Sequence, residues 1–168
     1  MPTIIEDTGQ KVGYHDNVKE WCDRNGIVLR RQKLNVGDYQ SPPRVAVDTK
    51  KGLMEVYSNV VHDHGRFKDE CIRAMDDGIR LVILIEDEEI TNLEEAKNWH
   101  NPLLEKWSSH IAYNKWLKDH GKPVSTRPPV SSSRLVGMMQ AMTMKYGVEW
   151  QFCHPDDTGK AIYEILNE

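Results

Sequence analysis

The sequence predicts one α/β domain whose central sheet is covered by helices on both sides, on three grounds. The chain has 168 residues, the usual size of a domain that buries a single core. Hydrophobic residues make up 39% of it and charged residues 29%, as in ordinary globular proteins. Segments with the periodicity of strands alternate with segments of helical periodicity, which is typical of a sheet packed between helices.

The N-terminal half of this pattern begins with a short strand that ends at Asp7. A helix follows, because Val18, Trp21 and Cys22 recur at helical spacing and Gly26 can end the helix. Alternating apolar residues predict two further strands, separated by a turn rich in glycine and proline, and then two helices. In order, these elements are expected at residues 3–6, 16–25, 27–34, 37–43 (the turn), 44–48, 52–61 and 66–77.

The C-terminal half begins with the continuous apolar run 80–85, which predicts a strand buried on both faces of the sheet. Residues 98–130 are the least regular part, and we expect a helical insertion that ends in a proline-rich linker. Ser131 can cap the next helix and Gly147 can close it. The last elements are a strand at residues 149–153 and a helix at 155–166, so that residues 1–168 form one domain.

The charge and the cysteines exclude several classes of protein. A formal net charge of −4 argues against a surface coated in positive charge, although a few cations are enough for a local basic groove. The three cysteines are far apart and form no CxxC pair, which predicts buried thiols in a reducing cytoplasm. No signal peptide is visible, and no apolar run is long enough to cross a bilayer, so we expect no membrane partner.

The segment from Gly37 to Lys50 holds the clearest candidate for chemistry. Asp38 lies at a glycine-containing turn, and Asp48 ends the next strand ten residues later. Lys50 is two residues beyond Asp48 and therefore points to the same side of the strand. If the flanking strands form a hairpin, the two carboxylates converge beside an ammonium group.

Two converging carboxylates repel each other unless a cation lies between them, and their hard oxygens suit Mg²⁺ or Mn²⁺. Such an ion polarises a phosphodiester and lowers the pKa of a bound water, while a nearby lysine stabilises charge on the phosphate. The spacing alone leaves two interpretations open: a hydrolytic metal site, or a surface hairpin with a solvated salt bridge.

Five separated pieces of the chain support the first interpretation. They are Ile4-Ile5-Glu6-Asp7-Thr8-Gly9-Gln10, Leu34-Asn35-Val36-Gly37-Asp38-Tyr39, Val47-Asp48-Thr49-Lys50, Gly65-Arg66 and a C-terminal stretch at residues 144–160. In this order they resemble the nuclease domain of XPF-type proteins, which belongs to the PD-(D/E)xK superfamily. The resemblance covers roughly residues 3–97 and 131–168, and it is nearest to small stand-alone phage and bacterial members.

The resemblance implies a restriction-endonuclease-like fold with a mixed sheet, Mg²⁺-dependent cleavage of DNA and a possible homodimer. The matched positions would be metal ligands at Asp38, Asp48 and the Thr49 carbonyl, the catalytic lysine at Lys50, a supporting acid at Asp7 and a phosphate contact at Arg66. No tandem helix-hairpin-helix module like that of many relatives follows, so a preference for branched or flap DNA does not carry over with the motifs.

The chain departs from the family pattern at two positions where relatives carry arginine. These positions are Thr49 and Gly9. Both changes remove positive charge near the site. They therefore bear on the cleavage rate and on the affinity for DNA, but they leave the metal ligands in place.

Other polar residues are weaker candidates. Arg30 and Arg31 could follow a DNA backbone, but a solvated strand face explains them at least as well; Lys51 could face DNA or merely begin a helix. Glu55 lies one position from the family's further acid. Glu20 lies where some nucleases of this fold class place an extra carboxylate, although a surface role is the stronger interpretation, and Gln10 closes the first motif.

Three tryptophans mark the expected insertion, at positions 99, 107 and 116. They could stack on bases. Packing of the insertion against the body of the domain is the interpretation that we favour.

The sequence therefore favours a Mg²⁺-dependent DNA endonuclease in repair, recombination or phage DNA processing, in the cytoplasm of a bacterium or a phage-infected host. The alternative is a catalytically weak or inactive pseudonuclease that binds DNA or protein, which the missing arginine at position 49 and the acidic net charge favour. A small-molecule phosphohydrolase is a weaker alternative, because the chain has no glycine-rich phosphate loop.

Overall fold

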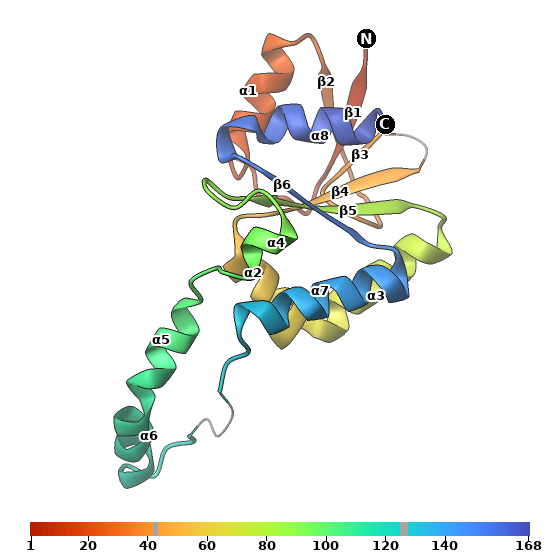
Figure 1. Cartoon of the computed structure of the whole chain (residues 1–168). Coiled ribbons are helices and arrows are strands. Elements are labelled where there is room, and N and C mark those ends of the chain that lie inside the picture. The colour runs from red at the N-terminus through yellow and green to blue at the C-terminus, as the bar shows by residue number, and fades with distance from the viewer. Residues whose placement is uncertain (42–43, 125–127) are drawn as a thin grey trace.

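A mixed six-stranded sheet runs through the middle of the molecule (Figure 1). This computed structural model describes residues 1–41, 44–124 and 128–168. Its strands are β1 (Thr3–Asp7), β2 (Val28–Gln32), β3 (Tyr39–Ser41), β4 (Val45–Lys50), β5 (Arg80–Glu86) and β6 (Glu149–Cys153). They lie in the order β2-β1-β3-β4-β5-β6. The β1–β2, β4–β5 and β5–β6 pairs are parallel, and β3 is antiparallel to both β1 and β4.

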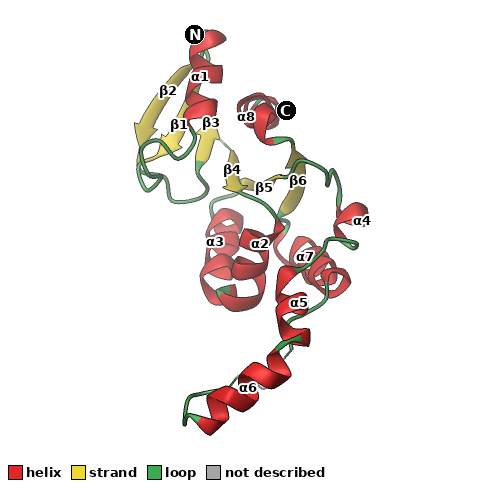
Figure 2. Ribbon diagram, turned by 90° about the vertical axis from the view of Figure 1, so that its left-hand side faces the viewer, coloured by secondary structure: helices red, strands yellow, loops and turns green. Residues whose placement is uncertain are grey.

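Helices cover both faces of this sheet, as Figures 1 and 2 show. On one face lie α1 (Asp16–Arg24) and α8 (Thr158–Leu166), the latter preceded by a 3-10 turn, Pro155–Asp157. On the other face lie α2 (Leu53–Tyr57), a π-helical turn (Ser58–His62), α3 (His64–Asp76) and α7 (Ser132–Tyr146). This arrangement confirms the predicted α/β class with its mixed sheet and flanking helices.

The central strand β5 joins the two hydrophobic cores. Leu81, Ile83 and Ile85 belong to the core under α2, α3 and α7, whereas Val82 and Leu84 belong to the core under α1 and α8. All five side chains are almost fully buried, each worth about 1.5–3 kcal/mol of transfer free energy. The uninterrupted apolar run therefore reflects a strand that is covered on both faces.

The turn expected at residues 37–43 is only partly correct. Residues 39–41 form β3, because pairing with β1 and β4 on its two sides satisfies their backbone groups; Pro42 and Pro43 lie outside the described residues. The helix expected at residues 52–61 is α-helical only to Tyr57 and continues as the π-helical turn. Within the described part of the chain, no helix is long and apolar enough to cross a membrane.

The expected insertion contains α5 (Pro102–Ser108) and α6 (His110–Asp119), and a short helix, α4 (Leu93–Ala96), precedes it. The α5–α6 segment projects away from the rest of the molecule in both ribbon views (Figures 1 and 2). Part of the expected proline-rich linker, residues 125–127, lies outside the described residues. Trp99 packs against the core as expected, but the packing expectation is wrong for Trp116, whose exposed fraction is 44%.

Candidate active site

A polar pocket of about 480 Å³ lies between the N-terminal half of α3 and the strands β1 and β4. Five of the residues singled out from the sequence line it: Asp7, Asp38, Asp48, Lys50 and Arg66. A second pocket, of about 510 Å³, lies between α1 and β2 and contains none of these five residues. The chemistry expected from the sequence therefore maps to the first pocket.

The backbone around Asp38 is tied to strands on both sides. Asp7 donates its N–H to the Asp38 carbonyl at 2.8 Å, and Asp38 donates its own N–H to the Val47 carbonyl at 2.8 Å. Gly37 has φ of 72°, and a Cβ at that position would lie 3.0 Å from the Val47 carbonyl oxygen. Glycine is required there because both the positive φ and the close approach exclude a side chain.

The Asp38 side chain is held by Thr49. Oδ2 of Asp38 accepts hydrogen bonds from the Thr49 backbone N–H at 2.9 Å and from the Thr49 hydroxyl at 2.8 Å. Thr49 is only 3% exposed. Thr49 therefore contributes a buried hydroxyl that orients a carboxylate.

Asp48 and Lys50 lie on the same side of β4 and form a buried ion pair. Lys50 Nζ is 2.8 Å from Asp48 Oδ2. Burial raises the pKa of Asp48 well above its ordinary value, and the carboxylates of Asp38 and Glu70 raise it further, against the lowering effect of Lys50. Burial alone would lower the pKa of Lys50, but the Asp48 carboxylate outweighs it, so the net shift is upward and Lys50 is an ammonium.

Asp7 occupies the far side of the pocket with its own cation. Its carboxylate accepts the Leu34 N–H at 2.8 Å and lies 3.1 Å from Lys33 Nζ. Burial raises the pKa of Asp7, but the hydrogen bond from Leu34 and the charge of Lys33 outweigh it and lower the pKa overall. A Cβ on Gly9 would lie 2.5 Å from Asp7 Oδ2, so the glycine that replaces the family's arginine also makes room for this carboxylate.

Glu70 is a pocket residue that the sequence reasoning missed. Its Oε1 accepts the Gly37 N–H at 2.9 Å, which anchors the backbone next to Asp38 to α3. Arg66, Glu70 and Arg73 line the same pocket at helical spacing i, i+4 and i+7. That spacing, counted forward from Gly65-Arg66, is the sequence signal that could have identified Glu70.

Two of the weaker candidates, Lys51 and Glu55, do not line this pocket; they form contacts at the start of α2. Lys51 donates from Nζ to the Tyr14 carbonyl at 3.0 Å and lies 3.9 Å from the centre of the Tyr14 ring. Glu55 accepts the Lys51 backbone N–H at 2.7 Å. Lys51 follows Lys50 by one residue and so leaves the strand on the other side.

Four further candidates also lie outside the pocket. Arg31 forms an ion pair with Glu6 at 3.1 Å and donates to the carbonyl of Gln10 at 2.6 Å, so it braces the loop after β1. Arg30 is exposed on β2, which is an edge strand, and Glu20 is exposed on α1. The surface interpretation of Glu20 fits this position.

The donor set fits a hard divalent cation held by two carboxylates. Asp48 is buried with its Oδ2 paired to Lys50 at 2.8 Å, and Asp38 has its Oδ2 engaged by Thr49, so each carboxylate also has a second oxygen to offer. Carboxylate oxygens are the ligands that Mg²⁺ prefers. Among the described residues, no group of three or more His, Cys, Asp or Glu side chains is placed to hold a metal ion.

Comparison with known proteins places this geometry in a family. The chain matches the family model described as the ERCC4 domain over residues 7–165. Two solved structures of XPF from Aeropyrum pernix, one of them in complex with DNA, are similar to it with a TM-score of 0.61 and identities of 14% and 15%. Each match covers 99% of this chain, which spans 64% of the length of those structures. No curated protein sequence matches the chain significantly.

Proposed function

Because this chain belongs to the ERCC4 domain family, we propose that it is a divalent-metal-dependent endonuclease that hydrolyses phosphodiester bonds in DNA. The observation that carries the proposal is the meeting of Asp38, Asp48 and Lys50 in one polar pocket. The whole sequence serves as one nuclease domain, from which the α5–α6 segment projects.

Each residue of the pocket has a role that its surroundings favour. Asp38 and Asp48, with the Thr49 carbonyl, would hold the cation, and the buried position of Asp48 makes its charge depend on neighbouring positive charge. Bound Mg²⁺ or Mn²⁺ supplies Lewis acidity toward the phosphate and a water of lowered pKa. Lys50, a buried ammonium, stabilises charge that develops on the phosphate.

The remaining charged residues suit a phosphate chain that enters the pocket. Arg66 and Arg73 lie on one face of α3 and line its wall. Lys33 is 74% exposed at its side chain and reaches Asp7 from the opposite side. Together these cations contact phosphates on both sides of the scissile bond, while Asp7 supports the site by fixing Lys33.

DNA is the proposed substrate, and flap, fork or junction structures are the forms to test first, in a role in repair, recombination or phage DNA processing. The XPF structure in complex with DNA supports DNA as the substrate class. A homodimer is the proposed assembly, and sedimentation of the purified chain measures it.

The proposal is tested by cleavage of labelled flap, fork, junction and plain duplex DNA with Mg²⁺ or with EDTA. We expect cleavage only with the metal, and a loss of about 100-fold or more in Asp48→Asn, Asp38→Asn and Lys50→Ala. Glu20→Gln is the matched control, because this carboxylate is exposed on α1 outside the pocket. Wild-type rates in Asp48→Asn or Lys50→Ala would refute the mechanism.

A pseudonuclease is the alternative, and Gly9 and Thr49 favour it because both stand where relatives carry arginine. In that case the chain binds DNA or a protein partner but does not cut any of the four DNA forms with Mg²⁺ or Mn²⁺. Retained DNA binding without cleavage in the wild type would establish this alternative.

A further inference from the structure

The α5–α6 arm, residues 101–124, carries a continuous row of aromatic rings. The rings belong to Trp107, His110, Tyr113, Trp116 and His120. The rings of Tyr113 and Trp116 are nearly parallel, with an interplanar angle of 5° and ring centres 6.0 Å apart, and Trp116 stacks on His120 at 4.1 Å. We call this row the aromatic face of the arm.

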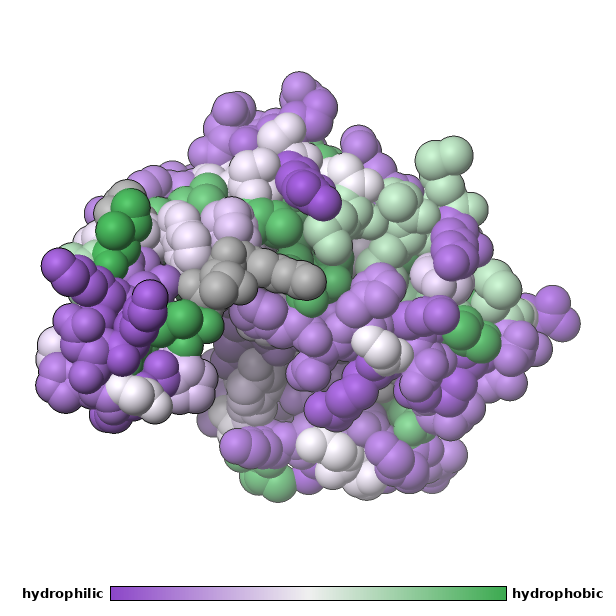
Figure 3. Space-filling view, turned by 90° about the horizontal axis from the view of Figure 1, so that it is seen from below, coloured by the Kyte–Doolittle hydropathy of each residue, from purple (hydrophilic) through white to green (hydrophobic). Residues whose placement is uncertain are grey.

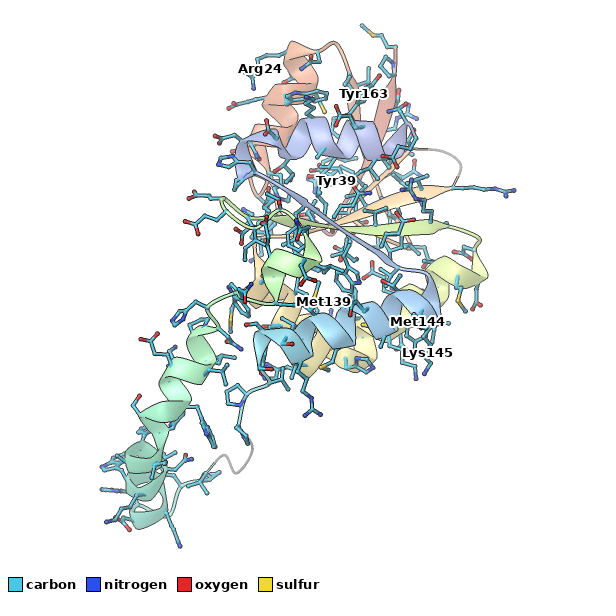
Figure 4. All side chains as sticks on the ribbon, viewed as in Figure 1. Arg24, Tyr39, Met139, Met144, Lys145 and Tyr163 are labelled. Atoms are coloured by element: carbon cyan, nitrogen blue, oxygen red, sulfur yellow. The ribbon has the colours of Figure 1, made fainter. Side chains whose placement is uncertain are left out.

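This face does not serve to pack the arm against the domain. Helix α6 buries none of its residues, and Tyr113 and Trp116 are 51% and 44% exposed. Side chains spread from the arm into open space in Figure 4, whereas Tyr39 and Met139, labelled there, lie inside the body. Seen from below, the molecule is mostly hydrophilic, with scattered hydrophobic side chains (Figure 3). An aromatic row on such a surface suits a ligand with flat rings.

The charge of the arm favours a polyanionic ligand. Residues 101–124 contain four lysines but only two acids, although the whole chain has a net charge of −4. The lysines are Lys106, Lys115, Lys118 and Lys122, and the acids are Glu105 and Asp119. Lys122 Nζ lies 5.1 Å from the centre of the Trp116 ring, so one cation is part of the aromatic face itself. At moderate salt, lysines attract phosphates over about 8–10 Å, a distance comparable to the diameter of a helix.

The base of the arm is joined to the body at the end of α2 by hydrogen bonds. The Asn101 side chain caps α5 by accepting the Leu103 N–H at 3.0 Å, and it donates to the Val130 carbonyl at 3.1 Å. Val130 in turn donates its N–H to the hydroxyl of Tyr57 at 2.9 Å. Tyr57 ends α2, the helix that directly follows β4 with Asp48 and Lys50. The base of the arm is therefore linked by hydrogen bonds to the helix that follows β4 in the chain.

We propose that the aromatic face binds a single-stranded stretch of DNA by stacking on its bases, while the lysines of the arm hold its phosphates. The identification of the ligand as DNA rests on the proposed nuclease function. A single strand is the fitting form because its bases have free faces, whereas bases in a duplex are stacked on one another. The arm thus binds a single-stranded stretch of the same DNA molecule that the proposed active site cuts.

Binding in EDTA tests this independently of cleavage. The probe is labelled oligothymidylate of about 16 nucleotides, and its affinity is measured by fluorescence anisotropy. We expect Trp116→Ala and Tyr113→Ala each to weaken binding about tenfold, and Trp116→Phe to restore most of it. Ile111→Ala is the matched control, because Ile111 is 79% exposed on the same helix but is not part of the aromatic face.

An abasic oligonucleotide of the same length separates stacking from charge. It should bind the wild type at least as weakly as oligothymidylate binds Trp116→Ala, because it loses stacking on every ring of the aromatic face. Lys115→Gln and Lys118→Gln should each weaken both oligonucleotides and reduce the salt dependence of binding. Circular dichroism confirms that each variant keeps its helices.

Three results would overturn the proposal. The first is equal affinity of the wild type for abasic and base-bearing strands. The second is unchanged oligothymidylate binding in Trp116→Ala. The third is a change in the oligomeric state of Trp116→Ala, which would make the aromatic face an interface between two copies. Failure of the nuclease function is a different result, because it would abolish cleavage and leave single-strand binding intact.

Discussion

Thr49 donates both its backbone N–H and its hydroxyl to one oxygen of Asp38, at 2.9 and 2.8 Å. This contact joins β4 to Asp38, the residue that precedes β3. Asp48 is the neighbour of Thr49 in β4, so one short stretch of β4 supplies one acid and orients the other. Thr49 is therefore a positioning residue for a proposed metal ligand.

Thr49→Val removes the hydroxyl and keeps nearly the same shape. We expect the affinity for Mn²⁺ to fall about tenfold to 100-fold, because Asp38 loses one of the two hydrogen bonds that orient it. The free energy of unfolding should fall by about 1 kcal/mol, the usual net worth of such a bond. Thr49→Ser retains the hydroxyl and is the control. Equal Mn²⁺ affinity in the valine and serine variants would show that the hydroxyl does not position Asp38.

Gly37→Ala should destabilise the fold by about 1–3 kcal/mol, since the added Cβ meets the Val47 carbonyl and the backbone is in the left-handed region. Gly137→Ala is the matched substitution, in the middle of α7 with nothing within 4 Å of its Cβ, and should stabilise by about 0.5–1 kcal/mol. Urea unfolding measures both. Effects of the same sign in the two variants would contradict this account of Gly37.

Much of the fold could be predicted because the strands carry clear patterns, above all the apolar run of β5. The strand β3 could not, because Tyr39–Ser41 is three residues long and is specified by its pairing with β1 and β4 rather than by its own composition. For the site, the spacing of Asp48 and Lys50 placed both on one side of a strand, and the structure brings them together. Glu70 was missed because its role depends on how α3 docks against Gly37.

Glu70→Ala should lower the free energy of unfolding by about 1–3 kcal/mol, because the Gly37 N–H then loses its acceptor in a partly buried place. Glu70→Gln keeps an acceptor oxygen and should cost less than half as much. Thermal unfolding of the two variants side by side gives the difference. If glutamine is as harmful as alanine, the negative charge of Glu70 matters more than its hydrogen bond.

Glu86, at the end of β5, should make stability depend on acid pH. Burial raises the pKa of this carboxyl, but His15, whose Nε2 lies 3.6 Å away, and a hydrogen bond from Thr158 outweigh burial, so the net pKa is lowered. A lowered pKa in the folded state means that the stabilisation is full above the unfolded-state value of about 4.3 and is lost as the pH falls through the lower folded value.

The measurement is urea unfolding of the wild type and Glu86→Gln between neutral pH and the acid limb. The variant should be less stable near neutral pH and should show a shallower loss of stability as the pH falls below about 4.5. Glu88→Gln is the control, because Glu88 is exposed in the loop that follows β5. Parallel pH profiles of the wild type and Glu86→Gln would exclude Glu86 as the source of the acid dependence.

The most direct test of the central claim is Mn²⁺ binding to the purified chain, measured by calorimetry for the wild type, Asp38→Asn, Asp48→Asn and the control Glu20→Gln. The account predicts that the wild type and Glu20→Gln bind the ion with the same affinity, and that each of the two asparagine variants binds it at least about 100-fold more weakly, since each loses a charged ligand. Wild-type affinity in both asparagine variants would contradict the assignment of the metal site to Asp38 and Asp48.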